Sequence, residues 1–370
     1  MTTKKHNKHP PLERPNIGMY NRCEWAIYGT TCQQITMLVD QITDRLSPGR
    51  KTVYVDADHS EGELSTELQV GKKRWSSDGA RSWSTYDDKL LAWPADLALI
   101  NGNHYPATRQ IVVIDPKKKN SLQRRVDQLT AIDIVLTEEE ADIYPFVREK
   151  MNEDTLLLKK ADLQGVADYL RAATAPPPVK ALVLAGGKSL RMSEDKATIA
   201  YHDGMPHEQY VASLCQQIGI ETYLSKGIAY KETTAYGLPV ITDRYVDMGP
   251  MGAILTAFMR EPDTAWLVLA CDLPLLDADT ISTLVEARRS TCYGTAYQVA
   301  GEPFPEPLLA IYEPAIYQRM LQFLSLGYAC PRKVLINSDI HLVPLTDNHK
   351  AYNANTPEEK EEALQKLTKK

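Results

Sequence analysis

The sequence lacks several features that would classify it at once. It has neither the G-x-x-x-x-G-K-[ST] pattern of a phosphate-binding loop nor the G-x-G-x-x-G pattern of a dinucleotide site. No apolar run is long enough to span a bilayer, and no apolar segment follows the basic N-terminus to make it a secretory signal. The six cysteines are scattered without a C-x-x-C pair, which is typical of a reducing compartment. We therefore expect a globular, cytoplasmic protein.

The charge balance argues against several kinds of partner. A net charge of −6 disfavours general binding to nucleic acid or to an anionic membrane, because both require a basic surface. The sequence also shows no Ser/His/Asp set and no cysteine with an evident activating partner. We therefore expect small-molecule substrates, no nucleic acid, no membrane, and no covalent nucleophile on the protein.

Three consecutive prolines divide the chain of 370 residues, a length that accommodates two or three domains. They lie in RAATAPPPVKA, and proline stiffens a connector because it fixes φ and donates no hydrogen bond. On each side the chain begins with a strand and a glycine turn. We predict a flexible arm over residues 1–19, an α/β domain over 20–171, a linker over 172–179 and a second α/β domain over 180–370.

The second half alternates apolar strands with helices. Strand-like segments such as KALVLAGG, GLPVITD and AWLVLACDLPLL are separated by helical segments such as HEQYVASLCQQI and MGPMGAILTAFMR. This alternation predicts a mostly parallel sheet with helices on both faces. Ligands of such sheets bind outside the carboxyl ends of the strands, so functional residues are expected directly after each strand.

A glycine turn with cationic residues follows the first of these strands. Gly186 and Gly187 have no side chains, so their backbone N–H groups can approach an anion or a flat base closely. Arg191 and Lys196 come next and are suited to phosphate oxygens. The stretch LVLAGGKSLRMSEDKA therefore predicts a nucleotide-binding segment.

Two aspartates follow later strands. Asp243 comes after GLPVIT and Asp272 after WLVLAC, and we expect them at neighbouring strand tips. A carboxylate at a buried strand end needs a cation, and Mg²⁺ binds one or two carboxylates together with phosphate oxygens and water. Asn353, in YNANTPEE, adds an amide that could cap a helix or complete the metal shell. The simplest chemistry is attack by a bound phosphate on the α-phosphorus of a nucleoside triphosphate, with pyrophosphate leaving.

These motifs resemble, in order, those of the molybdenum cofactor guanylyltransferases of the MobA type. LAGGKSLRMSEDKA is similar to LAGG-x-S-x-RMG-x-DK, MGPMGAILTA to GPL-x-GI-x-x-A, LACDLPLL to CD-x-P-x-L, PLLAIYEP to P-x-x-ALY and YNANTPEE to NxNTPEE. The resemblance implies a Rossmann-like nucleotidyltransferase domain that transfers GMP from GTP to the terminal phosphate of molybdopterin. It also implies Mg²⁺ as cofactor, with molybdoenzymes or other proteins of cofactor synthesis as protein partners.

The resemblance also implies roles for single residues. The catalytic residues would be Arg191, Lys196 and Asp272, of which Asp272 would hold the metal. The nucleotide would be bound by Leu184, Ala185, Gly186, Gly187, Lys196, Asp243, Gly249 and Asn353. The chain departs from the family pattern at Ser193, where glycine is usual, and at Ser225-Lys226, where asparagine is frequent. Two alternatives therefore stay open: a cytidylyl- or other nucleotidyltransferase acting on a pterin or sugar phosphate, and a non-catalytic scaffold that binds the molybdenum cofactor.

The N-terminal half resembles, more loosely, the MobB-type GTP-binding proteins that accompany this family. In WAIYGTTCQQITMLVDQI, Gly29 and Thr36 have the spacing of a P-loop, but Gln34 replaces its second glycine and Ile35 its lysine. Without that lysine the loop lacks the charge that contacts β- and γ-phosphates, and we expect Ile35 to face the phosphate position. The pattern predicts a degenerate P-loop-like α/β domain that does not bind triphosphate tightly.

Overall fold

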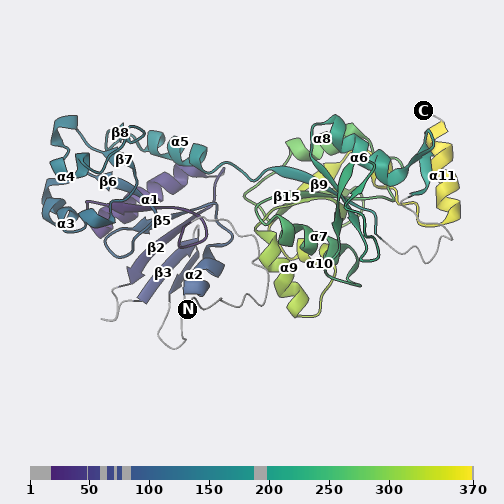
Figure 1. Cartoon of the computed structure of the whole chain (residues 1–370), viewed down its shortest axis with the longest axis horizontal. Coiled ribbons are helices and arrows are strands. Elements are labelled where there is room, and N and C mark those ends of the chain that lie inside the picture. The colour runs from purple at the N-terminus through teal and green to yellow at the C-terminus, as the bar shows by residue number, and fades with distance from the viewer. Residues whose placement is uncertain are drawn as a thin grey trace, which may run out of the picture. The chain divides into compact units, whose positions relative to one another are not determined.

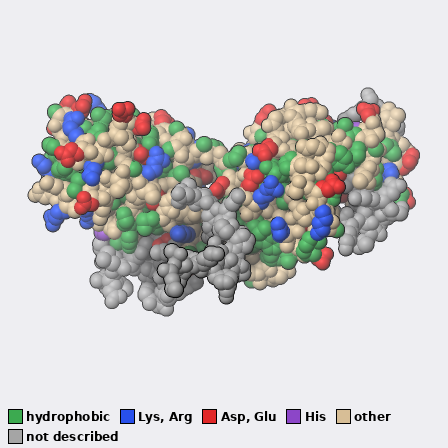
Figure 2. Space-filling view, in the orientation of Figure 1, with side chains coloured by type: hydrophobic (Ala, Val, Ile, Leu, Met, Phe, Trp, Pro, Cys, Tyr) green, Lys and Arg blue, Asp and Glu red, His purple; other side chains and the backbone are tan. Residues whose placement is uncertain are grey.

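The computed structural model describes residues 18–47, 49–58, 65–70, 73–76, 85–186 and 198–368. The chain divides into two compact units, Asn16–Pro176 and Pro177–Lys370, with the boundary inside the triple-proline stretch. Within the described ranges, every helix is too short or too polar to cross a bilayer. On the face seen in Figure 2, basic and acidic side chains are interspersed over both units.

The N-terminal unit is built on an eight-stranded sheet of order β4-β3-β2-β5-β1-β6-β7-β8. Six strands, β2, β5, β1, β6, β7 and β8, are parallel to their neighbours. Strands β3 and β4 extend the sheet beyond β2 as an antiparallel edge. The strands are β1 (Cys23–Tyr28), β2 (Thr52–Asp58), β3 (Ser65–Val70), β4 (Lys73–Ser76), β5 (Leu97–Asn101), β6 (Arg109–Val113), β7 (Ile132–Leu136) and β8 (Leu156–Leu158).

Helices cover both faces of this sheet. The longer ones are α1 (Cys32–Leu46) and α5 (Leu163–Ala173), and the shorter ones are α2 (Thr85–Ala92), α3 (Lys119–Gln123) and α4 (Pro145–Arg148). Successive residues of β1 point to opposite faces, so Trp25 and Ile27 pack with α1 and α5, and Ala26 and Tyr28 pack on the other side. The predicted α/β class of this half is confirmed, whereas its kinship to P-loop proteins stays a prediction.

The position of Ile35 differs from the prediction. Helix α1 begins at Cys32, only three residues after β1 ends, so Ile35 lies in the first turn of the helix. Its side chain is fully buried against Trp25 and Ile27 rather than facing a phosphate position. The expectation that Ile35 faces the phosphate position was wrong because helix α1 begins earlier than the P-loop spacing implies and turns this residue into the core.

The C-terminal unit contains a second eight-stranded sheet, of order β13-β14-β12-β9-β15-β17-β16-β18, and a small hairpin of β10 and β11. The strands are β9 (Val179–Leu184), β10 (Ala200–His202), β11 (Met205–Pro206), β12 (Thr222–Lys226), β13 (Thr234–Ala235), β14 (Leu238–Thr242), β15 (Ala265–Ala270), β16 (Gly294–Val299), β17 (Pro305–Tyr312) and β18 (Ile340–Leu345). Strands β14, β12, β9 and β15 are parallel, as predicted, and β17 turns antiparallel to β15.

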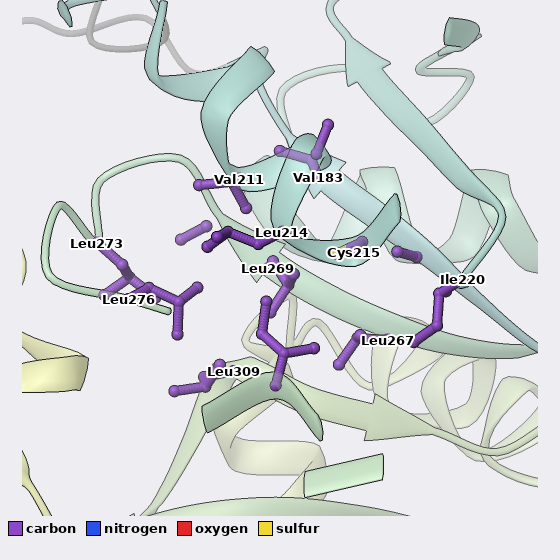
Figure 3. Packing of buried hydrophobic residues seen from close by; sticks show 14 of the residues in the cluster. Val183, Val211, Leu214, Cys215, Ile220, Leu267, Leu269, Leu273, Leu276 and Leu309 are labelled. Carbon is purple, nitrogen blue, oxygen red and sulfur yellow. The ribbon is translucent and has the colours of Figure 1, made fainter. Parts of the chain in front are cut away.

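Helices cover both faces of this sheet (Figure 1), and an apolar layer on each face packs against them. One face carries α6 (His207–Gln217) and α8 (Ala278–Glu286), and the other carries α7 (Gly249–Arg260), α9 (Ile316–Ser325) and α10 (Pro331–Ile336). Figure 3 shows Val211 and Leu214 of α6 beside strand residues Val183 and Leu269. Strands buried on both faces explain the unbroken apolar runs of the sequence.

The last helix, α11 (Pro357–Thr368), packs on the small hairpin. Ala363 is fully buried, and it clusters with Ile199, Tyr201 and Ala354. Thr356 and Glu359 begin the helix with a reciprocal pair of hydrogen bonds, at 3.2 Å to Thr356 Oγ1 and 2.9 Å to Glu359 Oε2. The segment YNANTPEE is thereby held against the unit, and its helix cap is a threonine rather than an asparagine.

Candidate functional site

Four strand ends of the C-terminal unit meet at one edge of its sheet. In the ladder, Leu184 pairs with both Ser225 and Ala270, and Ser225 pairs with Ile241. Gly186, Gly227, Asp243 and Asp272 each follow these paired residues by two positions in the sequence, and we call these four strand-end residues the row. The edge therefore carries two residues without side chains between two carboxylates.

The two aspartates do not lie on neighbouring strands, contrary to the prediction. Strands β12 and β9 separate β14, which ends before Asp243, from β15, which ends before Asp272. Three interstrand spacings of about 4.8 Å place the two backbones roughly 14 Å apart. The two carboxylates therefore cannot share one metal ion, but they can contact the two ends of one extended ligand.

Leu184, Ala185 and Gly186 occupy the centre of this edge. Ala185 is buried and donates its backbone N–H to Ser225 O at 3.0 Å. A Cβ atom at Gly186 would lie 2.8 Å from the backbone nitrogen of Gly227, closer than real side chains approach. Gly186 is thus required for the close packing of β9 against the end of β12.

Asp243 is fixed by hydrogen bonds from the end of β12. The Ser225 hydroxyl donates to its Oδ1 at 2.8 Å, and the Asp243 N–H donates to Lys226 O at 2.9 Å. Burial raises the pKa of Asp243, and the hydrogen bond from Ser225 lowers it. Ser225, at a position where the family often has asparagine, therefore orients the carboxylate.

Lys226 does not present its charge to the edge. Its ammonium group forms a buried ion pair with Glu208 of α6, and both residues are less than a tenth exposed. Burial of a charge is costly unless it is paired, so this contact holds α6 to the end of β12. Lys226 is structural in this arrangement, and sequence reasoning gave no role to Glu208.

Gly249 begins α7, which follows the Asp243 loop. Its φ of +54° lies in the left-handed region that favours glycine. The Arg244 N–H donates to Thr256 Oγ1 at 2.9 Å, which packs the loop onto α7. Gly249 is exposed at the start of the helix, where Met248 provides no side-chain cap.

Asp272 lies where several segments meet. The Ala354 N–H donates to Asp272 O at 3.0 Å, which places YNANTPEE beside the end of β15. Asn353 precedes this contact and donates its side-chain amide to Ala351 O at 3.2 Å. Burial, and then the negative charge of Asp272, raise the pKa of Tyr201 in β10 to about 12.

Glu306, at the start of β17, is a second acidic residue near Asp272. Its side chain is only 15% exposed and lies 3.3 Å from the Arg332 guanidinium of α10. Burial raises the pKa of Glu306, the Leu308 N–H and Arg332 lower it, and the negative charge of Asp272 raises it further. The sequence pattern missed this residue because the recognised motif begins one position later, at Pro307.

Three of the predicted site residues, Gly187, Arg191 and Lys196, lie outside the described residues. Of the others, Leu184, Ala185, Gly186 and Asp243 lie along the parallel strand ends, with Gly249 following the Asp243 loop. Asp272 and Asn353 lie at the other end of the row.

The donor set near Asp272 fits a metal ion that is bound together with a substrate. Within the described ranges there is no group of three His, Cys, Asp or Glu side chains that could hold a metal by itself. A carboxylate such as that of Asp272 is a donor that Mg²⁺ prefers, and water and phosphate oxygens commonly complete its shell. The residues present therefore fit Mg²⁺ brought in with a nucleotide.

Comparison with known proteins assigns the family. The MobA-like NTP transferase domain matches residues 181–340. A molybdenum cofactor biosynthesis bifunctional protein of Synechocystis is 35% identical over 193 residues, which cover 51% of this chain and 54% of that protein. A probable molybdenum cofactor guanylyltransferase of Flavobacterium johnsoniae is 30% identical over 135 residues, which cover 36% of this chain and 68% of that protein.

These matches assign a nucleotidyltransferase domain to residues 181–340. The chain belongs to the family of molybdenum cofactor guanylyltransferases. It spans about half the length of the Synechocystis bifunctional protein. Among solved structures, the molybdopterin-guanine dinucleotide biosynthesis protein A of Archaeoglobus fulgidus aligns with a TM-score of 0.44 and 20% identity, over 52% of this chain and 100% of that one.

Proposed function

We propose that the C-terminal unit transfers GMP from GTP to the terminal phosphate of molybdopterin and releases pyrophosphate. The main support is the row formed by Gly186, Gly227, Asp243 and Asp272 at the carboxyl ends of parallel strands. An open glycine surface with a carboxylate on either side suits a nucleotide, whose base and phosphates lie at opposite ends. Ligands of open α/β sheets bind at this edge.

Each residue of the row has a distinct part in the proposed reaction. Asp243, oriented by Ser225, binds the nucleoside end, and Gly186 with Gly227 leaves room for it. Asp272 holds Mg²⁺, which neutralises charge on the triphosphate when it is bound. From the sequence pattern, Arg191 and Lys196 contact the phosphates.

The transfer needs no nucleophile from the protein. An oxygen of the acceptor phosphate forms a bond to the α-phosphorus of GTP, and the bond from that phosphorus to the bridging oxygen of the β-phosphate breaks. Pyrophosphate leaves with that oxygen, so atoms and charge balance without an oxidant or a base. The protein contributes orientation and electrostatic stabilisation.

We further propose that the reaction is cytoplasmic, in keeping with scattered free cysteines. The N-terminal unit would be a relative of MobB-type proteins that has lost triphosphate binding. Molybdoenzymes or other proteins of cofactor synthesis would be protein partners.

Two measurements test the proposed function. Thermal stabilisation of the full chain by each of the four nucleoside triphosphates with Mg²⁺ should be largest for GTP. Pyrophosphate release should then require GTP, Mg²⁺ and molybdopterin together. Stronger stabilisation by CTP or UTP would reassign the base, and GTP binding without release in the presence of molybdopterin would favour a cofactor-binding scaffold.

A further inference from the structure

A thiol and an imidazole meet at the carboxyl edge of the N-terminal sheet. Strands β2, β5 and β1 are neighbours in that sheet and run parallel. Asp56 lies near the end of β2, His104 follows β5, and Cys32 begins α1 after β1. The Cys32 Sγ atom lies 3.2 Å from His104 Nε2, within hydrogen-bonding distance. The sequence did not reveal this partner of the thiol because the sheet alone brings the two residues together.

Asp56 is held where its charge acts on the His104 ring. The Tyr54 hydroxyl donates to Asp56 Oδ2 at 2.6 Å, and the Asn101 amide donates to Asp56 Oδ1 at 2.9 Å. Oδ1 of Asp56 lies 3.7 Å from His104 Nε2, and the two side chains are 15% and 16% exposed. A carboxylate at this distance stabilises the positive charge that the ring acquires when it takes up a proton. His104 is therefore placed to act as a base towards Cys32.

The loop after β5 fixes the thiol and the ring in this arrangement. The Asn103 amide donates to Cys32 Sγ at 3.5 Å and to Thr30 O at 3.0 Å. The His104 N–H donates to Asn101 O at 3.0 Å. An N–H donor beside the sulfur favours the negative charge that develops there when the thiol loses its proton. Nucleophile, base and donor are thus oriented before any ligand arrives.

No second thiol of this unit lies within reach of Cys32. Cys23 and Cys32 are its two cysteines, and Cys23 begins β1 whereas Cys32 follows the far end of that strand. At about 3.3 Å per residue, a strand of six residues separates them by roughly 20 Å, far more than a disulfide spans. A modified Cys32 therefore has no partner within the unit for an intramolecular disulfide.

We propose that Cys32 is a peroxide-reactive thiol for which His104 serves as the base. Cys32 Sγ forms a bond to one oxygen of hydrogen peroxide while its proton passes to His104, and the O–O bond breaks. The departing oxygen takes the proton from His104 and leaves as water. The thiol is oxidised to a sulfenic acid and the peroxide is reduced, so atoms and electrons balance.

The surroundings of the thiol favour this class of oxidant. Asp56 repels an anionic ligand, and the low exposure of Asp56 and His104 admits only a small one. Hydrogen peroxide is small and uncharged. With Cys23 roughly 20 Å away by the rise of β1, the sulfenic acid persists until an external thiol reduces it. This reaction lies beyond nucleotidyl transfer and belongs to the other unit.

The test is the rate at which each cysteine of the full chain forms a sulfenic acid with hydrogen peroxide at pH 7. Dimedone traps the sulfenic acid, and mass spectrometry quantifies the adduct peptide by peptide. Cys330 is the internal control, because it is exposed and also begins a helix, as the N-cap of α10. We expect Cys32, although less exposed, to react about tenfold faster than Cys330.

Three variants assign the difference to the imidazole. His104→Gln keeps a polar side chain but removes the base, and it should slow Cys32 about a hundredfold while the rate of Cys330 stays the same. Asp56→Asn keeps an acceptor for Tyr54 but removes the charge, so it should slow Cys32 severalfold. His349→Gln changes an exposed histidine of the C-terminal unit and should have no effect. Circular dichroism establishes that each variant is folded.

Two outcomes would overturn the proposal. One is a wild-type Cys32 that reacts no faster than Cys330, a comparison that needs no variant and therefore holds even if His104→Gln does not fold. The other is an unchanged Cys32 rate in folded His104→Gln, which would show that the thiol reacts without the base. Neither outcome bears on pyrophosphate release by the C-terminal unit, so the proposed function is tested separately.

Discussion

The two units begin alike, with a buried strand and a glycine, but they use the position after the strand differently. In the N-terminal unit, Gly29 has a φ of +90° and leads within three residues into α1. There Thr31 and Gln34 form a reciprocal cap on the first turn of the helix. In the C-terminal unit, Gly186 lies beside Gly227, so the two positions of the row between the aspartates carry no side chain of their own.

The edge of the N-terminal sheet is filled by its own polar contacts. Asn103 donates to Thr30 O at 3.0 Å, and Thr30 Oγ1 donates to Asp115 at 3.2 Å. His104 Nε2 lies 3.2 Å from Cys32 Sγ and 3.7 Å from Asp56. The N-terminus of α1 is therefore capped by its own side chains, with Asp115 in contact with Thr30, and both features disfavour an anion at this edge.

The largest effect should come from Asp272. We expect Asp272→Asn to reduce pyrophosphate release about a thousandfold, because the charge that holds the metal against the phosphates is lost. The readout is coupled detection of pyrophosphate with GTP, Mg²⁺ and molybdopterin. Asp279→Asn, at an exposed position of α8, is the matched control. Near-normal release by Asp272→Asn would mean that the acid at this strand end has no catalytic part.

The next largest effect should be a pH dependence of stability that is confined to the C-terminal unit. His207 is fully buried in the C-terminal unit, and burial, with a contribution from His202, lowers its pKa to about 4. The unfolded chain binds this proton near pH 6.5 and the folded unit does not, so stability is present above pH 6.5 and is lost as pH falls towards 4. The expected loss is about 3 kcal/mol over this window.

Urea unfolding of the full chain at pH 7 and pH 4.5 measures this loss, with the two units followed separately by hydrogen exchange. His207→Phe, which keeps an aromatic ring beside Tyr201 and Tyr210, should flatten the dependence, and exposed His349→Gln should not. An unchanged pH dependence in His207→Phe would assign the effect to other groups.

Replacing Gly186 in the C-terminal unit and Gly49 in the N-terminal unit by alanine should show whether the loss of nucleotide binding depends on the position of the glycine. Gly186→Ala should weaken GTP binding about tenfold, roughly 1.4 kcal/mol, because the added Cβ would displace Gly227 from the row. Gly49→Ala, at a glycine with ordinary space for a Cβ, serves as the control. Calorimetric titration with the non-hydrolysable α,β-methylene analogue of GTP measures the affinity of both variants. Equal affinities would show that the packing of Gly186 on Gly227 does not shape the site.

The smallest effect should come from the helix cap of the N-terminal unit. Thr31→Ala removes the acceptor for the Gln34 N–H and should cost about 1 kcal/mol of stability in that unit. Pyrophosphate release should be unchanged, since the cap belongs to an edge that carries no transfer chemistry. A loss of release in a folded Thr31→Ala protein would contradict the division of labour between the units.

Much of the C-terminal architecture was predictable because it depends on local pattern. The apolar runs of the sequence form strands β9, β14 and β15. Asp243 and Asp272 follow the points where two of those runs stop, so both could be predicted to lie at strand ends. The order of strands was not predictable, and the two acids were wrongly expected on adjacent strands. Strand order depends on pairings between distant segments, which leave no periodic trace in the sequence.

The sequence by itself determined the alternation of strands and helices, the glycine turns and which acidic residues follow strands, because these depend on neighbouring residues and on hydrophobic periodicity. The tertiary structure decided the rest. It buried Ile35, capped α11 with Thr356 and Glu359 and paired Lys226 with Glu208. It also placed β12 and β9 between the strands that precede Asp243 and Asp272, because strand order is set by packing across the whole sheet rather than by any strand alone.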